Sequence, residues 1–452
     1  MKQLVESQRN FFNSNATLSI RFRIQQLKKI KQILKENEDK LYQAIYTDFK
    51  KTSYETYISE LGHVYHEINK ACRKLKKWSG IKRAGTNLIN LPGRSYIVPV
   101  PLGVILVIAP WNFPYMLSLV PAISAIAAGN TVVLKPSELP VQTSHILARL
   151  MNDNFEPEFF RVIEGGIPET TELLNQKFDK IFFTGSVKVG KIVYKAAAKN
   201  LTPVTLELGG KNPAIVTETC RLRITAKRLI WAKYLNAGQT CVAPDYIMVH
   251  HSVKDEFLKL VAEEIEKSQF SWDNNNYVQI INKDHAKRLT GLLEGTTIYY
   301  GGKYDVENRY IEPTILTDVN FDHKIMQEEI FGPLFPVIEY DTIDTLITQI
   351  NSRPKPVACY IYTTDKRIRN KILYQVSFGG GMVNDSVVHF INSHLPFGGL
   401  GESGIGYYHG EYGFKNFTHY KGILGKLPWY EPNLRYFPHT KMKLSLIKRL
   451  IE

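Results

Sequence analysis

Apolar side chains recur every three or four residues through the first fifty positions of the chain. This spacing places them on one face of an amphipathic helix. The recurring positions are Ile20, Ile24, Leu27, Ile30, Leu34, Leu41 and Ile45. Charged and polar side chains fill the positions between them, and the same pattern continues over residues 59–80. The N-terminal part of the chain is therefore predicted to be helical.

The pattern changes at Gly103, where short, continuously apolar runs begin to alternate with helical stretches. Such runs are typical of strands in a parallel sheet that is covered on both faces. We expect strands at 103–110, 130–136, 160–165, 180–185 and 203–210, and helices at 116–129, 142–154, 172–176 and 186–200. A second α/β unit follows Lys211, with strands at 212–218, 245–252 and 358–365 and helices up to Tyr234 and at 253–268. Open sheets of this kind bind ligands at the carboxyl ends of their strands.

The composition indicates an ordinary globular protein of two or three domains. The chain has 452 residues, of which 44% are hydrophobic and 22% charged, as in soluble proteins generally. The cysteines lie far apart and show no zinc spacing, which favours free thiols, a reducing compartment and a cytoplasmic location; they are Cys72, Cys220, Cys241 and Cys359. The N-terminus lacks a signal-peptide core, and the apolar runs are too short to span a membrane. His63 and His66 lie three positions apart, but no metal motif completes them, so no metal is expected.

The net charge of +14 raises the question of an anionic partner. Nucleic acid, a membrane surface and an anionic cofactor are the alternatives. Most basic side chains alternate with acidic ones along helical faces, so we interpret them as solvated surface and expect no nucleic-acid binding. The basic amphipathic segment 441–452 is the exception. It could touch a membrane surface or a partner subunit, although we expect a docked terminal helix.

Two glycine-rich segments are candidates for a phosphate-binding loop. Residues 396–406 contain a literal GxGxxG, but they lack the preceding strand and following helix that a dinucleotide fingerprint requires, and we predict a loop. In FFTGSVKVGKIV, a strand runs into Gly185 and Ser186 and a helix follows. The N-terminus of that helix suits a pyrophosphate, and Gly190 can allow close helix packing. Lys135 and Glu138 follow another strand, where Glu138 could accept the hydroxyls of an adenosine ribose. An ordinary turn or loop is the alternative at both places.

The segment NAGQTCVAPDY holds Cys241 in a small polar loop. A nucleophilic cysteine needs thiolate character, access and fixed donors for the oxyanion formed by attack on a carbonyl. Asn112, between two prolines in APWNFPY, could supply one donor and the Cys241 N–H another. Glu207, at a strand end before two glycines, could activate water to release a thioester, and its burial would raise its pKa. Taken singly, each residue also has a structural alternative. Cys241 could be an inert buried thiol, Asn112 a turn former and Glu207 an ion-pair partner.

Several motifs occur together in a specific order: PWNFP, KPSE, FTGS, LELGGKNP, NAGQTC, QEEIFGP and PFGGLGESG. Over nearly its whole length the chain resembles the NAD(P)-dependent aldehyde dehydrogenase superfamily, and VNDSVVHF and GYYHGEYGFKNFTHYK resemble its class 3 or fatty-aldehyde branch. The resemblance implies an α/β fold with two doubly wound parallel-sheet domains and a small β oligomerisation element. The implied limits are 1–207 for the dinucleotide-binding domain, with 79–100 contributing to the oligomerisation element, 208–402 for the catalytic domain, and 403–452 for the oligomerisation element and tail.

The resemblance also implies the residue roles. Cys241 would attack the aldehyde, Asn112 would hold the oxyanion with the Cys241 N–H, and Glu207 would activate the water that releases a carboxylic acid. The dinucleotide would be bound by Lys135, Glu138, Gly185, Ser186, Glu329 and Phe331. Glu138 favours NAD, with NADP tolerated. Apolar aldehydes, medium-chain aliphatic or aromatic, and a homodimer are expected. Fatty-aldehyde members often carry a membrane-spanning C-terminal segment, which residues 441–452 do not supply.

Two rival functions stay open at this point. An acyl-transferring relative would pass the thioester to coenzyme A or phosphate, and Glu207 argues for hydrolysis instead. A non-catalytic scaffold or basic nucleic-acid binder on the same fold is the other alternative. The joint presence of Cys241, Asn112 and Glu207 argues against it, because a binder has no use for the complete set.

Overall fold

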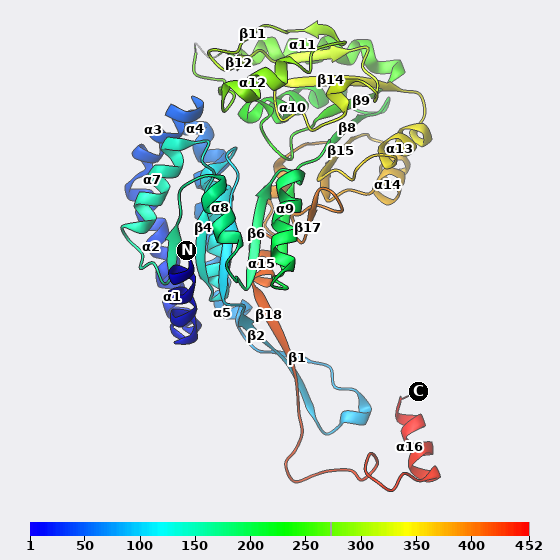
Figure 1. The fold of residues 1–452 in the computed structure, drawn as a ribbon. Helices are drawn as coiled ribbons and strands as arrows, with labels where there is room; N and C mark the ends of the chain where they lie inside the picture. The colour runs from blue at the N-terminus through cyan, green and yellow to red at the C-terminus, as the bar shows by residue number, and fades with distance from the viewer. Residues whose placement is uncertain (272–273, 452) are drawn as a thin grey trace.

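Two parallel β-sheets form the body of the protein in the computed structural model, which describes residues 1–271 and 274–451 (Figure 1). The first sheet has the strand order β17-β7-β6-β3-β4-β5, and the second has the order β10-β13-β14-β9-β8-β15-β16. A three-stranded antiparallel sheet, β1-β2-β18, extends away from the body as an arm. The predicted α/β class with two parallel-sheet units and a small β element is confirmed.

The first sheet consists of the strands that the apolar runs between 103 and 210 predict, with one short addition. Every neighbouring pair is parallel except β17 with β7. The strands are β3 (Val104–Ile108), β4 (Thr131–Lys135), β5 (Phe160–Val162), β6 (Lys180–Gly185), β7 (Val204–Leu208) and β17 (Gly404–Ile405). The GxGxxG segment leads into β17 and not into a helix, so it is not a dinucleotide fingerprint.

Helices cover both faces of the first sheet, which explains why its strands are apolar throughout. Within β3, Val104 and Leu106 contribute to the core on one face, and Ile105 and Val107 to the core on the other. The first face is covered by α1 (Lys2–Asn13), α8 (Ile167–Leu174) and α9 (Val187–Ala198). The second is covered by α2 (Ile20–Glu36), α3 (Glu38–Phe49), α5 (Gly62–Trp78), α6 (Pro114–Ala128) and α7 (Val141–Asn152). The short elements η1 (Ala16–Leu18), α4 (Ser53–Thr56) and η2 (Tyr57–Leu61) connect the N-terminal helices.

The second sheet is parallel except for its edge strand β10, and it surrounds its own apolar core. Its strands are β8 (Pro213–Val216), β9 (Tyr246–His250), β10 (Thr297–Tyr300), β13 (Thr314–Thr317), β14 (Leu334–Tyr340), β15 (Ala358–Tyr362) and β16 (Gly380–Val383). Its helices are α10 (Leu222–Tyr234), α11 (Lys254–Ser268), α12 (Lys283–Thr290), α13 (Ile343–Asn351) and α14 (Lys366–Gln375). Shorter elements are η4 (Leu235–Gly238), η5 (His251–Val253), β11 (Tyr304–Asp305), β12 (Tyr310–Ile311), η6 (Lys324–Met326) and η7 (Val388–Ile391).

After the second sheet the chain returns to the first. Strand β17 joins the edge of that sheet, and α15 (Gly410–Asn416) packs against α5 and α6 through Phe414. The chain then enters the arm, where β18 (Thr418–Gly425) pairs with β2 (Arg94–Pro101), and β2 with β1 (Lys82–Ala84); η3 (Leu88–Asn90) lies in the connection. The domain limits given above stay a prediction, and residues 404–416 pack with the first sheet ahead of the arm.

The C-terminal helix α16 (Lys441–Ile451) lies at the far end of the arm, against η3 and away from both sheets (Figure 1). No residue of this helix is buried, and Met442 and Leu444 are 71% and 55% exposed. The helix contacts η3 without burying any of its residues, so the expectation of a docked terminal helix stays a prediction. Among the described helices, none combines the length and apolarity needed to cross a membrane.

Candidate active site

The predicted site residues gather at one edge of the first sheet. β3 leads towards Asn112, β4 ends at Lys135, β6 ends at Gly185, and Glu207 lies near the end of β7. These strands are parallel neighbours, so their carboxyl ends meet at the same edge. Cys241 comes from the loop between α10 and β9 of the second sheet and shares a pocket with Glu207. The site therefore lies where the two parallel-sheet units meet.

The loop that carries Cys241 is a tight turn attached to the second sheet by a buried amide. Residues 236–238 all have positive φ, between 50° and 73°. The Asn212 side chain donates to the carbonyl oxygens of Cys241 at 2.7 Å and Ala243 at 2.9 Å. Its own oxygen accepts from the N–H of Ala358 in β15 at 2.8 Å. One amide thus fixes the backbone on both sides of the thiol.

Asn112 is 2% exposed and reaches the Cys241 loop from the other domain. Its side-chain nitrogen donates to the carbonyl oxygen of Gln239 at 3.0 Å. The backbone carbonyl oxygen of Asn112 accepts from the side-chain amide of Asn236 at 3.0 Å. The same amide donates to the backbone carbonyl oxygen of Gln239 at 3.1 Å. The Asn112 amide therefore lies beside the loop of the thiol, as an oxyanion donor must. The role itself stays a prediction.

Glu207 is a buried carboxyl group with no polar partner. It is 4% exposed, and neither of its side-chain oxygens forms a hydrogen bond with the described residues. Burial raises its pKa well above the ordinary value, as expected for a carboxyl removed from water. Such an arrangement is costly for a folded protein, and strongly perturbed groups of this kind concentrate at functional sites.

Cys241 is partly exposed towards the pocket, and its pKa is raised to about 12. Burial is the main cause, followed by the carboxyl groups of Glu329 and Glu207. The thiolate character that a nucleophile needs is therefore not a property of the resting site. A proton acceptor or a positive charge has to act on the thiol when the reaction begins.

Glu329 approaches the same region from the loop before β14. A Cβ atom at Gly209 would fall 1.9 Å from one of its carboxylate oxygens, so a side chain there would displace this carboxylate. Burial and Asp245 raise the pKa of Glu329 to about 8, opposed by a hydrogen bond from the Gly210 backbone. Its other oxygen is buried without a partner. Gly209, the first of the two glycines that follow β7, thus gives room to the Glu329 carboxylate.

Phe331 lies two residues beyond, with a left-handed φ of 51°. Its ring packs edge-on against Trp111, with 5.3 Å between the ring centroids. Trp111 belongs to the same loop as Asn112, so this contact joins the loop after β3 to the loop before β14. The predicted position of Phe331 beside the nicotinamide ribose stays a prediction.

Lys135 and Glu138 form a pair at the end of β4. The Lys135 ammonium group donates to the Pro136 carbonyl oxygen at 2.6 Å and lies 3.8 Å from the Glu138 carboxylate. Lys135 is 2% exposed, and its burial lowers its pKa, whereas half of the Glu138 side chain is exposed. Glu138 also lies next to Gly166, at the start of α8. A carboxylate with solvent access beside a buried cation is suited to hydroxyl groups of a sugar.

The N-terminus of α9 follows Gly185 directly. Ser186 is the N-cap residue, and its hydroxyl accepts from the Val189 N–H at 3.3 Å. A Cβ atom at Gly190 would fall 2.6 Å from a methyl group of Leu208 in β7. The structure thus agrees with close packing of this helix at Gly190. Its N-terminus presents unpaired N–H groups at the same sheet edge as Lys135.

The pocket beside Cys241 is predominantly apolar. Besides the thiol and Glu207, its aromatic lining comes from Phe113, Phe390, Phe397 and Tyr408. Phe113 and Phe397 line the pocket, whereas Tyr115 and Tyr234 belong to the buried cores.

Sequence reasoning missed the residues that hold the two loops of the second sheet together. Lys211 forms an ion pair with Asp245 at 2.5 Å and donates to the carbonyl oxygen of Glu328 at 2.8 Å. Asp245 accepts from the N–H of Ile330 at 3.0 Å. This network fixes the Glu329 segment relative to the Cys241 loop. Its members lie within or beside recognisable motifs, but their pairing over 34 and 85 positions is not visible in the sequence.

Comparison with known proteins identifies the family. A family model described as "Aldehyde dehydrogenase family" matches residues 1–423. The chain belongs to the aldehyde dehydrogenase family. A 4,4'-diaponeurosporen-aldehyde dehydrogenase of Staphylococcus aureus is 45% identical over 97% of this chain and 96% of its own length. Aldehyde dehydrogenase family 3 member A2 of Mus musculus is 41% identical over 99% and 93%. A structure described as the substrate-bound state of Staphylococcus aureus AldH has a TM-score of 0.97 and 43% identity, and covers 100% of this chain and 99% of its own.

This aldehyde dehydrogenase oxidises aldehydes to carboxylic acids with NAD(P)+, and its relatives include class 3 members. The residues at the sheet edge fit such a dinucleotide. The α9 N-terminus behind Ser186 offers N–H groups for phosphate, and the pair of Lys135 and Glu138 lies nearby. The unpartnered oxygen of Glu329 would gain a donor from a ribose hydroxyl. We assign these residues to cofactor binding as a prediction.

Proposed function

We propose that this aldehyde dehydrogenase oxidises apolar aldehydes, medium-chain aliphatic or aromatic, through a thioester on Cys241 that Glu207 helps to hydrolyse. The observation that carries the proposal is the shared pocket. A thiol and an unpartnered buried carboxyl group line the same apolar cavity. An apolar aldehyde would place its carbonyl carbon at the sulfur and its tail among aromatic side chains.

The chain's own residues can perform each proton and bond change. The Cys241 thiol gives its proton to the Glu207 carboxylate, which passes it on to solvent water. The sulfur then bonds to the carbonyl carbon, and the carbonyl electron pair moves to oxygen, where the Asn112 amide and the Cys241 N–H stabilise it. Bound NAD(P)+ supplies the acceptor for the hydride that the adduct loses as it becomes a thioester. Water then attacks the acyl carbon and gives a proton to Glu207, the carbon–sulfur bond breaks, and the product is a carboxylic acid.

The raised pKa of Glu207 fits this role. A general base is most effective when its pKa lies near the working pH, and burial moves this carboxyl group upward from the ordinary range. Glu207 has no hydrogen-bond partner among the described residues that would lower its pKa and weaken it as a base. Water that enters the pocket would become its hydrogen-bond partner.

The test is production of reduced nicotinamide over a panel of aliphatic and aromatic aldehydes with each dinucleotide. Cys241→Ala should abolish turnover, whereas the matched control Cys220→Ala, a thiol remote from the pocket, should retain it. Glu207→Gln should give an initial burst followed by a stall, with an acyl group on Cys241 detectable by mass spectrometry. An adduct on another side chain, or equal steady rates in Glu207→Gln, would refute the mechanism. A product that becomes a coenzyme A thioester when coenzyme A is added would favour the acyl-transferring alternative.

The quaternary and cellular context belongs to the same proposal. A homodimer is supported by the arm, which extends from the body with exposed apolar side chains. The dispersed free thiols support a cytoplasmic, reducing location. The exposed α16, with its basic side chains, supports weak contact with a membrane surface. Sedimentation analysis and vesicle co-sedimentation test the first and last of these.

A further inference from the structure

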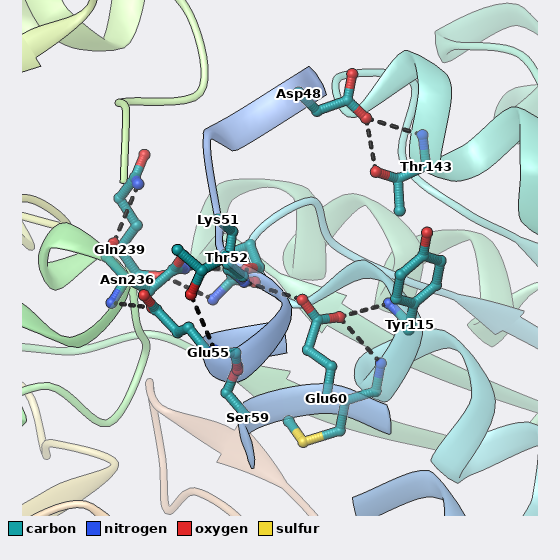
Figure 2. Close-up of polar contacts among 12 residues, drawn as sticks. Asp48, Lys51, Thr52, Glu55, Ser59, Glu60, Tyr115, Thr143, Asn236 and Gln239 are labelled. Atoms are coloured by element: carbon teal, nitrogen blue, oxygen red, sulfur yellow. Dashed lines mark hydrogen bonds and ion pairs between the residues drawn. The ribbon is translucent and has the colours of Figure 1, made fainter. Parts of the chain in front are cut away.

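A buried polar network underlies the site, and it starts from a short segment of the first domain, residues 51–60 (Figure 2). This segment runs from the end of α3 through α4 and η2. It carries Lys51, Glu55 and Glu60, which point towards the loops of the two domains that meet at the site. The function proposed above assigns none of these residues a role.

Lys51 and Glu60 form an ion pair that is completely removed from solvent. Their charged atoms are 2.9 Å apart, and both side chains are 0% exposed. A second oxygen of Glu60 accepts from the N–H groups of Tyr115 at 2.8 Å and Met116 at 3.4 Å, in the first turn of α6. A carboxylate at a helix N-terminus is favourable. Here it fixes the first turn of α6, which begins two positions after Asn112.

Lys51 also contacts the Asn112 loop itself. Its ammonium group lies 3.4 Å from the Asn112 carbonyl oxygen and 4.6 Å from the centre of the Phe113 ring. Lys51 therefore holds Asn112 through its backbone carbonyl oxygen. Glu60 holds the residues that follow it, through the N–H groups of Tyr115 and Met116. A buried charge pair of this kind contributes little to net stability, so its presence calls for another explanation.

Glu55 reaches the other loop. Its carboxylate accepts from the backbone N–H of Asn236 at 2.9 Å. Asn236 has a left-handed φ of 54° and begins the turn that leads to Cys241. Its side chain bridges the carbonyl oxygens of Asn112 and Gln239 at 3.0 and 3.1 Å. The same segment therefore touches the Asn112 loop and the Cys241 loop.

We infer that Lys51 and Glu60, supported by Glu55, are positioning residues that set the Asn112 amide relative to the Cys241 N–H. An oxyanion hole works only when its donors are fixed before charge develops. The two donors come from different domains, so their separation depends on a connection between the domains. The 51–60 segment is such a connection. Its positioning role rests on the oxyanion role proposed above for Asn112.

The test is a double-mutant cycle measured on the full-length enzyme. Lys51→Met should lower kcat about 10²-fold, approaching the 10²–10³ that loss of one oxyanion donor costs, with KM for the dinucleotide within about twofold. In the Asn112→Ala background the same change should lower kcat by less than about threefold, because there is no amide left to position. Lys35→Met, which removes the ammonium group of a more exposed pair with Glu38, is the matched control and should leave kcat unchanged.

Glu55→Gln is the second variant, since it keeps an oxygen for the Asn236 N–H and disturbs folding less than loss of a buried charge. Glu55→Gln should lower kcat about fivefold, and this loss should disappear in the Asn112→Ala background. Equal losses in both backgrounds would show a purely structural role and overturn the inference. A wild-type kcat in Lys51→Met would do the same. Wild-type kcat in Asn112→Ala would overturn the oxyanion role itself, whereas Cys241→Ala tests the proposed reaction independently.

Discussion

Removal of the Asn212 amide should destabilise the protein measurably, because one side chain serves three backbone groups. In Asn212→Ala the carbonyl oxygens of Cys241 and Ala243 and the N–H of Ala358 lose their partner. A buried polar group left without a partner costs about 1–3 kcal/mol. Cys241 is partly exposed, so water can replace one of the three bonds. The remaining two predict a loss of about 2–6 kcal/mol.

The expected shift in melting temperature follows from the size of the chain. Unfolding entropy is about 2.1 cal/mol/K per residue, which gives about 1 kcal/mol/K for this chain. Asn212→Ala should therefore melt about 2–6 °C lower in differential scanning calorimetry. The matched control is Asn351→Ala, an exposed amide that donates to the carbonyl oxygen of Gln375 at 2.7 Å, and it should shift by less than 1 °C. Equal shifts in the two variants would refute the reasoning.

Two further predictions concern the pH dependence and the cofactor. Because burial raises the pKa of Glu207 and only the ionised carboxylate accepts a proton, thioester hydrolysis should accelerate as pH rises above the range in which an ordinary glutamate ionises. A pH-independent rate in stopped-flow measurements would contradict this. Glu138→Gln removes a half-exposed carboxylate beside Lys135 and should raise kcat/KM for NADP relative to NAD about tenfold, about 1.4 kcal/mol. An unchanged NADP-to-NAD ratio in steady-state assays would place the adenosine ribose elsewhere.

Local sequence patterns predicted the secondary structure of the first sheet well, but for the second sheet they predicted only β8, β9 and β15 and missed β10, β13, β14 and β16. The apolar run at 103–110 became β3, and Gly129 ends α6 in a left-handed conformation. Such signals are local, because a strand buried on both faces must be apolar at every position. The order of the motifs indicated the family, since each motif reflects a local backbone requirement.

The contacts between motifs were not predictable in the same way. Gly209 gives room to Glu329, which lies 120 positions away and belongs to a different motif. The high pKa of Cys241 depends on burial and on two carboxyl groups from separate loops. The terminal helix α16 has a clear amphipathic pattern and yet is exposed. Each of these three features depends on which surfaces pack together in the folded chain. The periodicity of apolar residues along the sequence carries no information on that packing.

The sequence by itself thus determined the two α/β units, the thiol, the amide and the carboxyl group, because residue type and apolar spacing act over a few positions. Only the tertiary structure decided that Lys51, Glu55 and Glu60 lie beneath the loops of Asn112 and Cys241. The physical reason is that hydrogen bonds and charge pairs depend on distances of a few ångströms. Packing of the two domains sets those distances between residues that lie far apart along the chain.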